Sequence, residues 1–120
     1  MAKSEHRRQD EIRLALSEGG IVLRLNSGKF WQGKRVWSNE FQQYVLIDLR
    51  PVQGCPPGTS DLLFIGSDGR VAFIECKDDK GKLRPEQERF IGIMKSYGHR
   101  AGVARSTEDA LKIIGVNNGD

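Results

Sequence analysis

The segment 61–77 constrains the fold more than any other part of the chain. Two largely apolar runs, 61–65 and 70–77, flank Gly66-Ser67-Asp68-Gly69, a sequence typical of a turn between antiparallel strands. In the second run, apolar side chains alternate onto both faces as far as Glu75. A strand that is apolar on both faces is usually covered on both, so we expect this hairpin in the interior of a sheet.

The rest of the chain predicts an α/β fold, a small mixed β-sheet flanked by helices in the order αβ(β)ββαβα. Glycines and prolines mark element ends, and capping residues mark helix starts. We expect helices over 4–17, over 85–97 and after Ser106, strands over 21–25, 44–49 and 101–105, and an irregular segment over 26–43. The spacing of Phe90, Ile93, Met94 and Tyr97 predicts the buried face of the helix 85–97.

Composition indicates a globular protein without a membrane span. The chain has 120 residues, of which 29% are charged, which fits one domain over 1–115 with a flexible tail over 116–120. Its apolar runs are far shorter than the roughly 20 residues of a membrane span, and its start lacks the apolar region of a secretory signal. Cys55 and Cys76 stand in unrelated contexts, which predicts neither a disulfide framework nor a zinc site. We therefore expect a reduced, cytoplasmic protein.

The turn length determines where Asp61 lies. A three-residue loop, 67–69, pairs Gly66 with Arg70, and counting back places Asp61 opposite Glu75 on the same face. A two-residue loop would place Asp61 on the other face. In the first register, two carboxylates and the Lys77 ammonium converge, an arrangement suited to a divalent cation. The alternative is structural: a buried ion pair between Lys77 and Glu75, with Asp61 capping a turn.

Some polar residues lie on helix faces that are otherwise apolar, and they could supply further ligands from the helices to the same part of the sheet. Gln87 lies on the stripe of Phe90 and Met94, and Glu5 and Gln9 continue the stripe of Ile12 in the first helix. Each of these polar groups alone fits an exposed first turn. Together they indicate further polar side chains directed toward the sheet.

These residues carry a resemblance. Asp61 followed by Glu75-Cys76-Lys77 resembles the Asp…Glu-x-Lys signature of restriction-endonuclease-like nucleases. The wider string is similar to the VRR-NUC (virus-type replication-repair nuclease) branch of the PD-(D/E)xK superfamily. That string comprises Glu5 with Gln9, Gly58-Thr59-Ser60-Asp61-Leu62, Glu75-x-Lys77 and Gly81-x-Leu83-x-Pro85-x-Gln87. Two departures are Ser60 where the superfamily pattern has proline, and a longer, aromatic segment over 30–43.

The resemblance implies a restriction-endonuclease-like core and Mg²⁺- or Mn²⁺-dependent hydrolysis of DNA phosphodiesters. Asp61, Glu75 and the backbone carbonyl of Cys76 would hold the metal, and Lys77 would orient the attacking water. Gln87 would position Lys77 or a water, and Glu5 would be an outer or second-metal ligand. Stand-alone phage members of the branch suggest a homodimer that cuts four-way (Holliday) junctions.

Basic clusters predict the DNA contacts. The net charge of +3 is mildly basic and agrees with a polyanionic partner. The residues expected at DNA are Arg7, Arg8, Lys80, Lys82 and Arg84, together with Lys29, Lys34, Arg35, Trp31 and Trp37. The two tryptophans have two interpretations, stacking on unpaired bases or an apolar contact between subunits.

Two other function classes stay open. The first is a catalytically inactive nuclease fold that binds DNA or a protein partner, with Lys77 in a structural role. The second is a small redox protein that uses Cys76 or Cys55. The sequence disfavours the redox class, because neither cysteine has a neighbouring thiol or an activating helix start.

Overall fold

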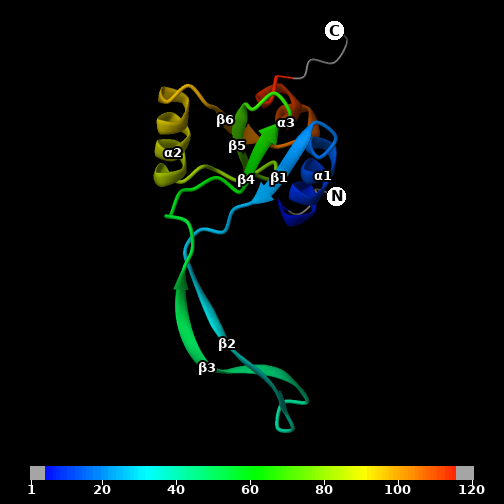
Figure 1. The fold of residues 1–120 in the computed structure, drawn as a ribbon, viewed down its shortest axis with the longest axis vertical. Helices are drawn as coiled ribbons and strands as arrows, with labels where there is room; N and C mark the ends of the chain where they lie inside the picture. The colour runs from blue at the N-terminus through cyan, green and yellow to red at the C-terminus, as the bar shows by residue number, and fades with distance from the viewer. Residues whose placement is uncertain (1–4, 116–120) are drawn as a thin grey trace.

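A computed structural model describes residues 5–115, which form a three-layer core and a projecting arm (Figure 1). The predicted α/β class is confirmed. The elements follow in the order α1 (Glu5–Leu16), β1 (Gly20–Arg24), β2 (Lys29–Ser38), β3 (Gln43–Gln53), β4 (Leu62–Gly66), β5 (Val71–Cys76), α2 (Pro85–Ser96), β6 (Arg100–Ala104) and α3 (Thr107–Ile113). The predicted tail, 116–120, lies outside the described residues.

The central sheet has the strand order β1-β4-β5-β6, so β4 and β5 are its inner strands. β5 and β6 are parallel and are connected through α2, whereas the other pairs are antiparallel. A parallel pair needs a long crossover, and here the helix supplies it. The hairpin expected in the interior of the sheet therefore occupies that position.

The turn between β4 and β5 has the three-residue form. The Gly66 amide donates to the Arg70 carbonyl at 2.9 Å, and Gly69 has a φ of +84°, a conformation that glycine adopts without strain. Leu62 pairs with Ile74 in the resulting register. Asp61 therefore lies opposite Glu75, as the sequence predicts.

One face of the sheet packs on α1 and α3 and forms the main core. The buried cluster on that side consists of Ile12, Leu16, Leu62, Phe64, Ala72, Ile74, Cys76, Ala104, Ala110 and Ile114. The alternate residues of β5 face α2, where the rings of Phe73 and Phe90 meet edge to face at 5.4 Å. β5 is thus covered on both sides, which buries the end of the strand where Glu75 stands.

The buried face of α2 differs from the predicted stripe. Gln87 and Ile91 are buried, whereas Tyr97 is 69% and Ile93 39% exposed. The helix covers only part of the sheet, and a hydrogen bond from Gln87 to Glu75 turns that side of the helix inward. The face of α2 that packs against the sheet therefore contains a polar side chain, Gln87, as well as apolar ones.

The prediction of an irregular segment over 26–43 is wrong. Residues 29–38 and 43–53 form a second, two-stranded sheet, the β2–β3 arm. A bulge between Gln32 and Lys34 and the positive φ of Asp48, 55°, bend it without ending it. Pro51 is tolerated because each strand of a two-stranded sheet is an edge strand.

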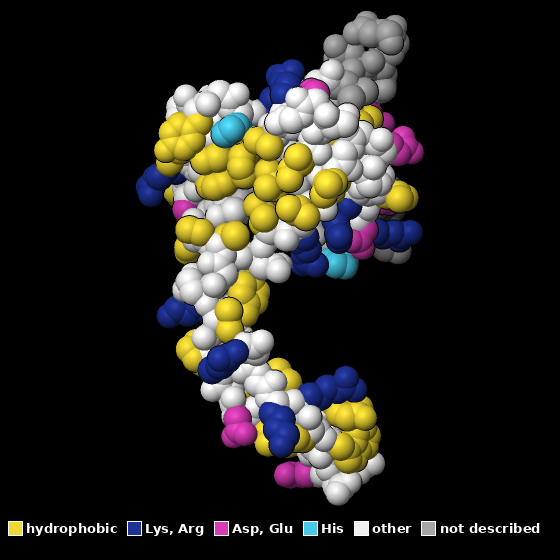
Figure 2. All heavy atoms as spheres, viewed as in Figure 1, with side chains coloured by type: hydrophobic (Ala, Val, Ile, Leu, Met, Phe, Trp, Pro, Cys, Tyr) yellow, Lys and Arg dark blue, Asp and Glu magenta, His cyan; other side chains and the backbone are white. Residues whose placement is uncertain are grey.

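The arm projects away from the core. Its base is fixed by backbone hydrogen bonds, among them Cys55 N–H to the Asn26 carbonyl at 2.8 Å. The principal extents of the molecule, 59 × 33 × 30 Å, reflect this projection, which Figures 1 and 2 show as a curved extension below the core. Within residues 5–115, no helix combines the length and the apolar character needed to cross a membrane.

Gly58 connects the arm to the strand that carries the candidate site, and its substitution tests this connection. Its φ is +95°, and a Cβ there would stand 2.5 Å from the Glu86 carbonyl oxygen. We expect Gly58→Ala to lower the free energy of unfolding by more than about 1 kcal/mol in urea titrations, because strain and a clash combine.

Gly92→Ala is the matched control, since a Cβ on this exposed glycine of α2 meets no described atom within 4 Å. It should raise the free energy of unfolding by up to about 1 kcal/mol through helix propensity. Equal effects of the two substitutions would contradict the proposed constraint at Gly58.

Candidate active site

Asp61 and Glu75 stand side by side at the edge where β4 begins and β5 ends. One Asp61 oxygen, Oδ2, accepts a hydrogen bond from the Cys76 backbone amide at 2.8 Å. This bond fixes the Asp61 carboxylate against the end of β5, because Cys76 directly follows Glu75. The hairpin register thus brings together two acidic groups that are 14 residues apart in the chain.

Glu75 is almost fully buried, with 2% of its surface exposed. Its Oε1 accepts a hydrogen bond from Gln87 Nε2 at 3.0 Å and lies 3.8 Å from Lys77 Nζ. Its Oε2 is buried and has no hydrogen-bond partner among the described residues. An ionised carboxylate with such an oxygen is costly to bury, so the site favours either a proton shared with Asp61 or a cation at this position.

The charges around Glu75 are not balanced. Burial, followed by the charge of the neighbouring Asp61 carboxylate, raises the pKa of Glu75 to about 8. A side-chain hydrogen bond with Asp61 and the charge of Glu5 add to this rise, while Lys77 opposes it without cancelling it. Two acidic groups this close retain one proton unless a further cation joins them. The electrostatics therefore favour a cation beside Asp61 and Glu75.

Lys77 is held by β6 and by the loop that follows β5. Its amide donates to the Ala104 carbonyl at 3.1 Å, and only 9% of the residue is exposed. Gly81 lies against its aliphatic stem, since a Cβ on Gly81 would be 3.2 Å from Lys77 Cδ. The loop is itself fixed by the Asp78 carboxylate, which accepts from the amides of Lys80 and Gly81 at 3.0 and 2.6 Å.

Gln87 connects the helix start to the acidic pair. Its Oε1 accepts from the Arg84 amide at 2.9 Å, which satisfies one of the free N–H groups at the start of α2, while its Nε2 donates to Glu75. Both ends of the amide are therefore engaged. This side chain orients the Glu75 carboxylate in the structure as it stands.

The first turn of α1 approaches the same site. Glu5 begins the helix, is partly exposed, and contributes to the raised pKa of Glu75. Gln9 is buried on the same stripe, and its Oε1 has no hydrogen-bond partner within the described part of the chain. The sequence pattern identified both residues, although not which of them is buried.

Arg8 is placed differently from the expectation of an open DNA contact. It is 9% exposed, and its guanidinium donates to Asp79 Oδ1 at 2.8 Å and to the Arg105 carbonyl. This pair lowers the pKa of Asp79 below its usual value. Arg8 thus connects α1 to the loop after β5 and to the end of β6, a role that the sequence pattern did not reveal because the partners are distant in the chain.

The other basic residues expected at DNA fall into two groups. Lys80, Lys82 and Arg84 are exposed on the loop after β5, next to the acidic pair in sequence, and Arg84 lies 3.2 Å from Glu86. Arg7 is exposed on α1. Lys29, Lys34, Arg35, Trp31 and Trp37 are exposed on the arm. The structure therefore separates the arm residues from the residues around Glu75.

Cys76 is not suited to redox chemistry. Both are free thiols, and Cys76 is fully buried in the core. Burial and the nearby carboxylates raise the pKa of Cys76 to about 12, so its thiol stays neutral and unreactive. The redox class, already disfavoured by the sequence, has no support at this site.

Few side chains at the site could bind a metal ion. In residues 5–115, no group of three or more His, Cys, Asp or Glu side chains is arranged to hold a metal ion. The pair of Asp61 and Glu75 nevertheless fits a hard cation such as Mg²⁺, because its donors are carboxylate oxygens and one of them is buried without a partner. The remaining ligands would be the Cys76 carbonyl and water.

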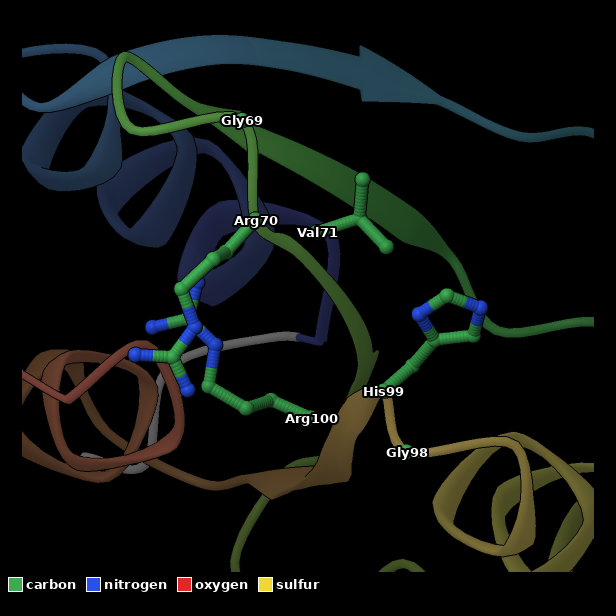
Figure 3. A pocket seen from close by; sticks show the side chains of 6 residues that line it. All are labelled: Gly69, Arg70, Val71, Gly98, His99 and Arg100. Carbon is green, nitrogen blue, oxygen red and sulfur yellow. The ribbon is translucent and has the colours of Figure 1, made fainter.

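A separate pocket lies at the opposite end of β5. It has a volume of about 170 Å³ and is lined by Gly69, Arg70, Val71, Gly98, His99 and Arg100. Figure 3 shows the guanidinium groups of Arg70 and Arg100 side by side, with His99 turned away from them. Arg100 donates a hydrogen bond to the Ile114 carbonyl, so it caps the C-terminal end of α3. The pocket shares no residue with the acidic pair.

Comparisons with known proteins agree with the geometry. A solved structure described as a VRR_NUC domain is 24% identical, with a TM-score of 0.59 over 94% of this chain and 96% of that chain, which establishes a shared fold. No match was found among the curated proteins. The VRR-NUC domain model matches residues 4–108. The chain therefore belongs to the VRR-NUC domain family and has its nuclease-type fold.

Proposed function

We propose that this protein is a metal-dependent, structure-selective DNA endonuclease that hydrolyses phosphodiester bonds. The observation that carries the proposal is the buried Glu75 carboxylate beside Asp61, with one oxygen unpaired and Lys77 Nζ 3.8 Å from the other. Membership of the VRR-NUC family supports nuclease activity and DNA as the partner.

Asp61 and Glu75, with the Cys76 carbonyl, are the residues that would hold Mg²⁺ or Mn²⁺. Such an ion, when bound, lowers the pKa of a coordinated water and draws electron density from a phosphate oxygen. Binding would also neutralise the acidic pair, so Glu75 would lose its retained proton. Glu5, whose charge already reaches Glu75, would act as an outer ligand.

Lys77 would act on the phosphate, and Gln87 would act through Glu75. Lys77 is anchored by its buried stem, so its ammonium is preorganised to stabilise negative charge that develops on the phosphate. Gln87 would hold the Glu75 carboxylate in its ligating orientation through the bond at 3.0 Å. Gln87 is thus a positioning residue in this proposal.

The proposed substrate is branched DNA, with a four-way junction as the sharpest form. Lys80, Lys82 and Arg84 would contact phosphates next to the acidic pair, with Arg7 on the α1 side. A homodimer would place two such sites about a two-fold axis, matching the symmetry of a junction. The phage origin implied by the resemblance and the cytoplasmic location expected from the composition stay predictions.

The alternative function is a nuclease fold that only binds DNA or a protein partner. It is favoured by the proximity of Lys77 to Glu75, which fits a buried ion pair, and by the short ligand inventory in residues 5–115. Under this alternative the acidic pair would bind no divalent ion, and no metal would produce cleavage.

One prediction of this proposed function concerns cleavage. Wild type should cut an end-labelled four-way junction with Mg²⁺ or Mn²⁺ and not with EDTA. Lys77→Ala should slow cleavage by at least about a hundredfold, because a preorganised charge at the reacting phosphate is lost. Folding by circular dichroism and DNA affinity should change little.

Lys95→Ala is the matched control, since Lys95 is exposed in the last turn of α2. Parallel flap, duplex and single-stranded substrates test selectivity: equal cutting of all of them would remove the junction preference and keep the nuclease. Cleavage at the wild-type rate by Lys77→Ala would refute the role of Lys77, and no cleavage by folded wild type would favour the binding module.

Another prediction concerns how the thermal stability of the metal-free protein depends on pH. The pKa of Glu75 is about 8 in the folded chain against a usual 4.5, so the folded state binds this proton more tightly than the unfolded state. Its stabilising effect is complete below pH 4.5 and is lost as the pH rises toward 8. In EDTA at alkaline pH, Glu75→Gln should therefore melt at least about 4 °C above wild type.

The melting difference should shrink at pH below 5 and when Mn²⁺ is added to wild type. Glu88→Gln, an exposed acid in the first turn of α2, should show neither effect. A melting difference between Glu75→Gln and wild type that is the same at acidic and alkaline pH would mean that Glu75 does not retain its proton on folding.

A further inference from the structure

The β2–β3 arm carries most of the exposed large apolar side chains of the described chain. They are Phe30, Trp31, Trp37, Phe41, Tyr44, Leu46, Ile47, Leu49 and Val52. Neither strand packs extensively on another helix or strand of residues 5–115, and an isolated two-stranded hairpin is marginally stable in water. Figure 2 shows the arm standing clear of the core. Another molecule must therefore cover the exposed apolar side chains of the arm.

The two faces of the arm differ in chemistry. The cross-strand pairs Trp31–Pro51, Arg35–Leu46 and Trp37–Tyr44 share one face. A Cβ on Gly33 would stand 2.9 Å from Leu49 Cδ2, which places Leu49 on that face as well. We call the set Trp31, Gly33, Arg35, Trp37, Tyr44, Leu46, Leu49 and Pro51 the apolar arm face. The opposite face is mixed and consists of the pairs Phe30–Val52, Gln32–Arg50, Lys34–Ile47 and Val36–Val45.

The composition of the apolar arm face favours a protein partner over DNA. It contains no acidic residue and carries two cations: Lys29, which pairs with Gln53 at the base of the arm, and Arg35, which stacks 3.8 Å from the centroid of the Tyr44 ring. Protein interfaces are enriched in aromatic residues and arginine and depleted in lysine and acids. A surface for single-stranded DNA needs cations along its length, and here Lys34 and Arg50 point the other way.

The size of the face matches one side of a dimer interface. Trp31, Trp37, Tyr44, Leu46 and Leu49 are 49–62% exposed and together present roughly 600 Å². A standard interface takes about 800 Å² from each partner. The bulky rings lie toward both ends, and the side chain of Leu49 covers Gly33 between them. This arrangement suits packing against the same face turned by a two-fold axis.

We propose that the apolar arm face binds the apolar arm face of a second copy of this chain. This inference rests on the proposed homodimer and names its surface. It leaves Lys34 and Arg50, on the opposite face, available to DNA. It also decides between the two interpretations of Trp31 and Trp37 in favour of a subunit contact.

Two neighbouring residues of β3 give a matched test by sedimentation. Leu46, 49% exposed, lies on the apolar arm face, and Ile47, 41% exposed, lies on the other. Wild type should sediment at twice its chain mass of 13.5 kDa. Leu46→Asp should raise the dimer dissociation constant by about thirtyfold or more, and Ile47→Asp should leave it within about threefold. Both place one aspartate on β3, so damage to the strand is shared.

A measurement on wild type keeps the test independent of folding in the variants. Trp31 and Trp37 are the two tryptophans of the chain, and both lie on the apolar arm face. Their emission should shift to the red on dilution, in step with dissociation of the dimer. Circular dichroism of each variant reports whether the core is intact.

Three results would overturn the proposal. Wild type could be a monomer at every concentration. A dimer that survives Leu46→Asp as well as Ile47→Asp would place the contact elsewhere, for example at Ile21 and Leu23 of β1, which are 61% and 44% exposed. A monomer whose tryptophan emission responds to single-stranded DNA would make this a DNA surface. None of these results bears on metal-dependent cleavage, which the Lys77→Ala assay tests separately.

Discussion

The burial of one carboxylate, Glu75, organises the site and much of the structure around it. The residue stands at the end of a strand covered on both sides, where an ionised group without partners is unfavourable. Gln87 and Lys77 approach one of its oxygens, and Asp61 is fixed beside it by the Cys76 amide. The strand, its hairpin partner and the start of α2 thus meet at a single acidic position that is not electrically balanced.

The elements around this acidic position are fixed to one another by side-chain and backbone contacts. The loop after β5 is fixed by Asp78 and by the Arg8–Asp79 pair, which connects it to α1. Gly81 leaves room for the Lys77 stem. Under the proposed function, these contacts would keep the groups in place before a substrate binds, as preorganised catalysis requires.

Local sequence signals predicted how Asp61, Glu75 and Gln87 are arranged, because this geometry follows from local rules. A three-residue turn with glycine at the left-handed position determines the register of Asp61 and Glu75, and helix periodicity places Gln87 toward the sheet. The pairing of Arg8 with Asp79 escaped prediction because the partners are far apart in sequence. The arm escaped because Gly33 and Pro51 are typical of loops, whereas a bulge and an edge position allow both in strands.

The central claim is that Asp61 and Glu75 exist to hold a divalent cation. Calorimetric titration of Mn²⁺ into wild type and Asp61→Asn tests it most directly, because the amide keeps the shape and the acceptor oxygen while removing the charge. The account predicts a binding isotherm for wild type that weakens at least about tenfold in Asp61→Asn, equivalent to about 1.4 kcal/mol. An isotherm unchanged by the substitution, or wild type that binds no Mn²⁺, would contradict it.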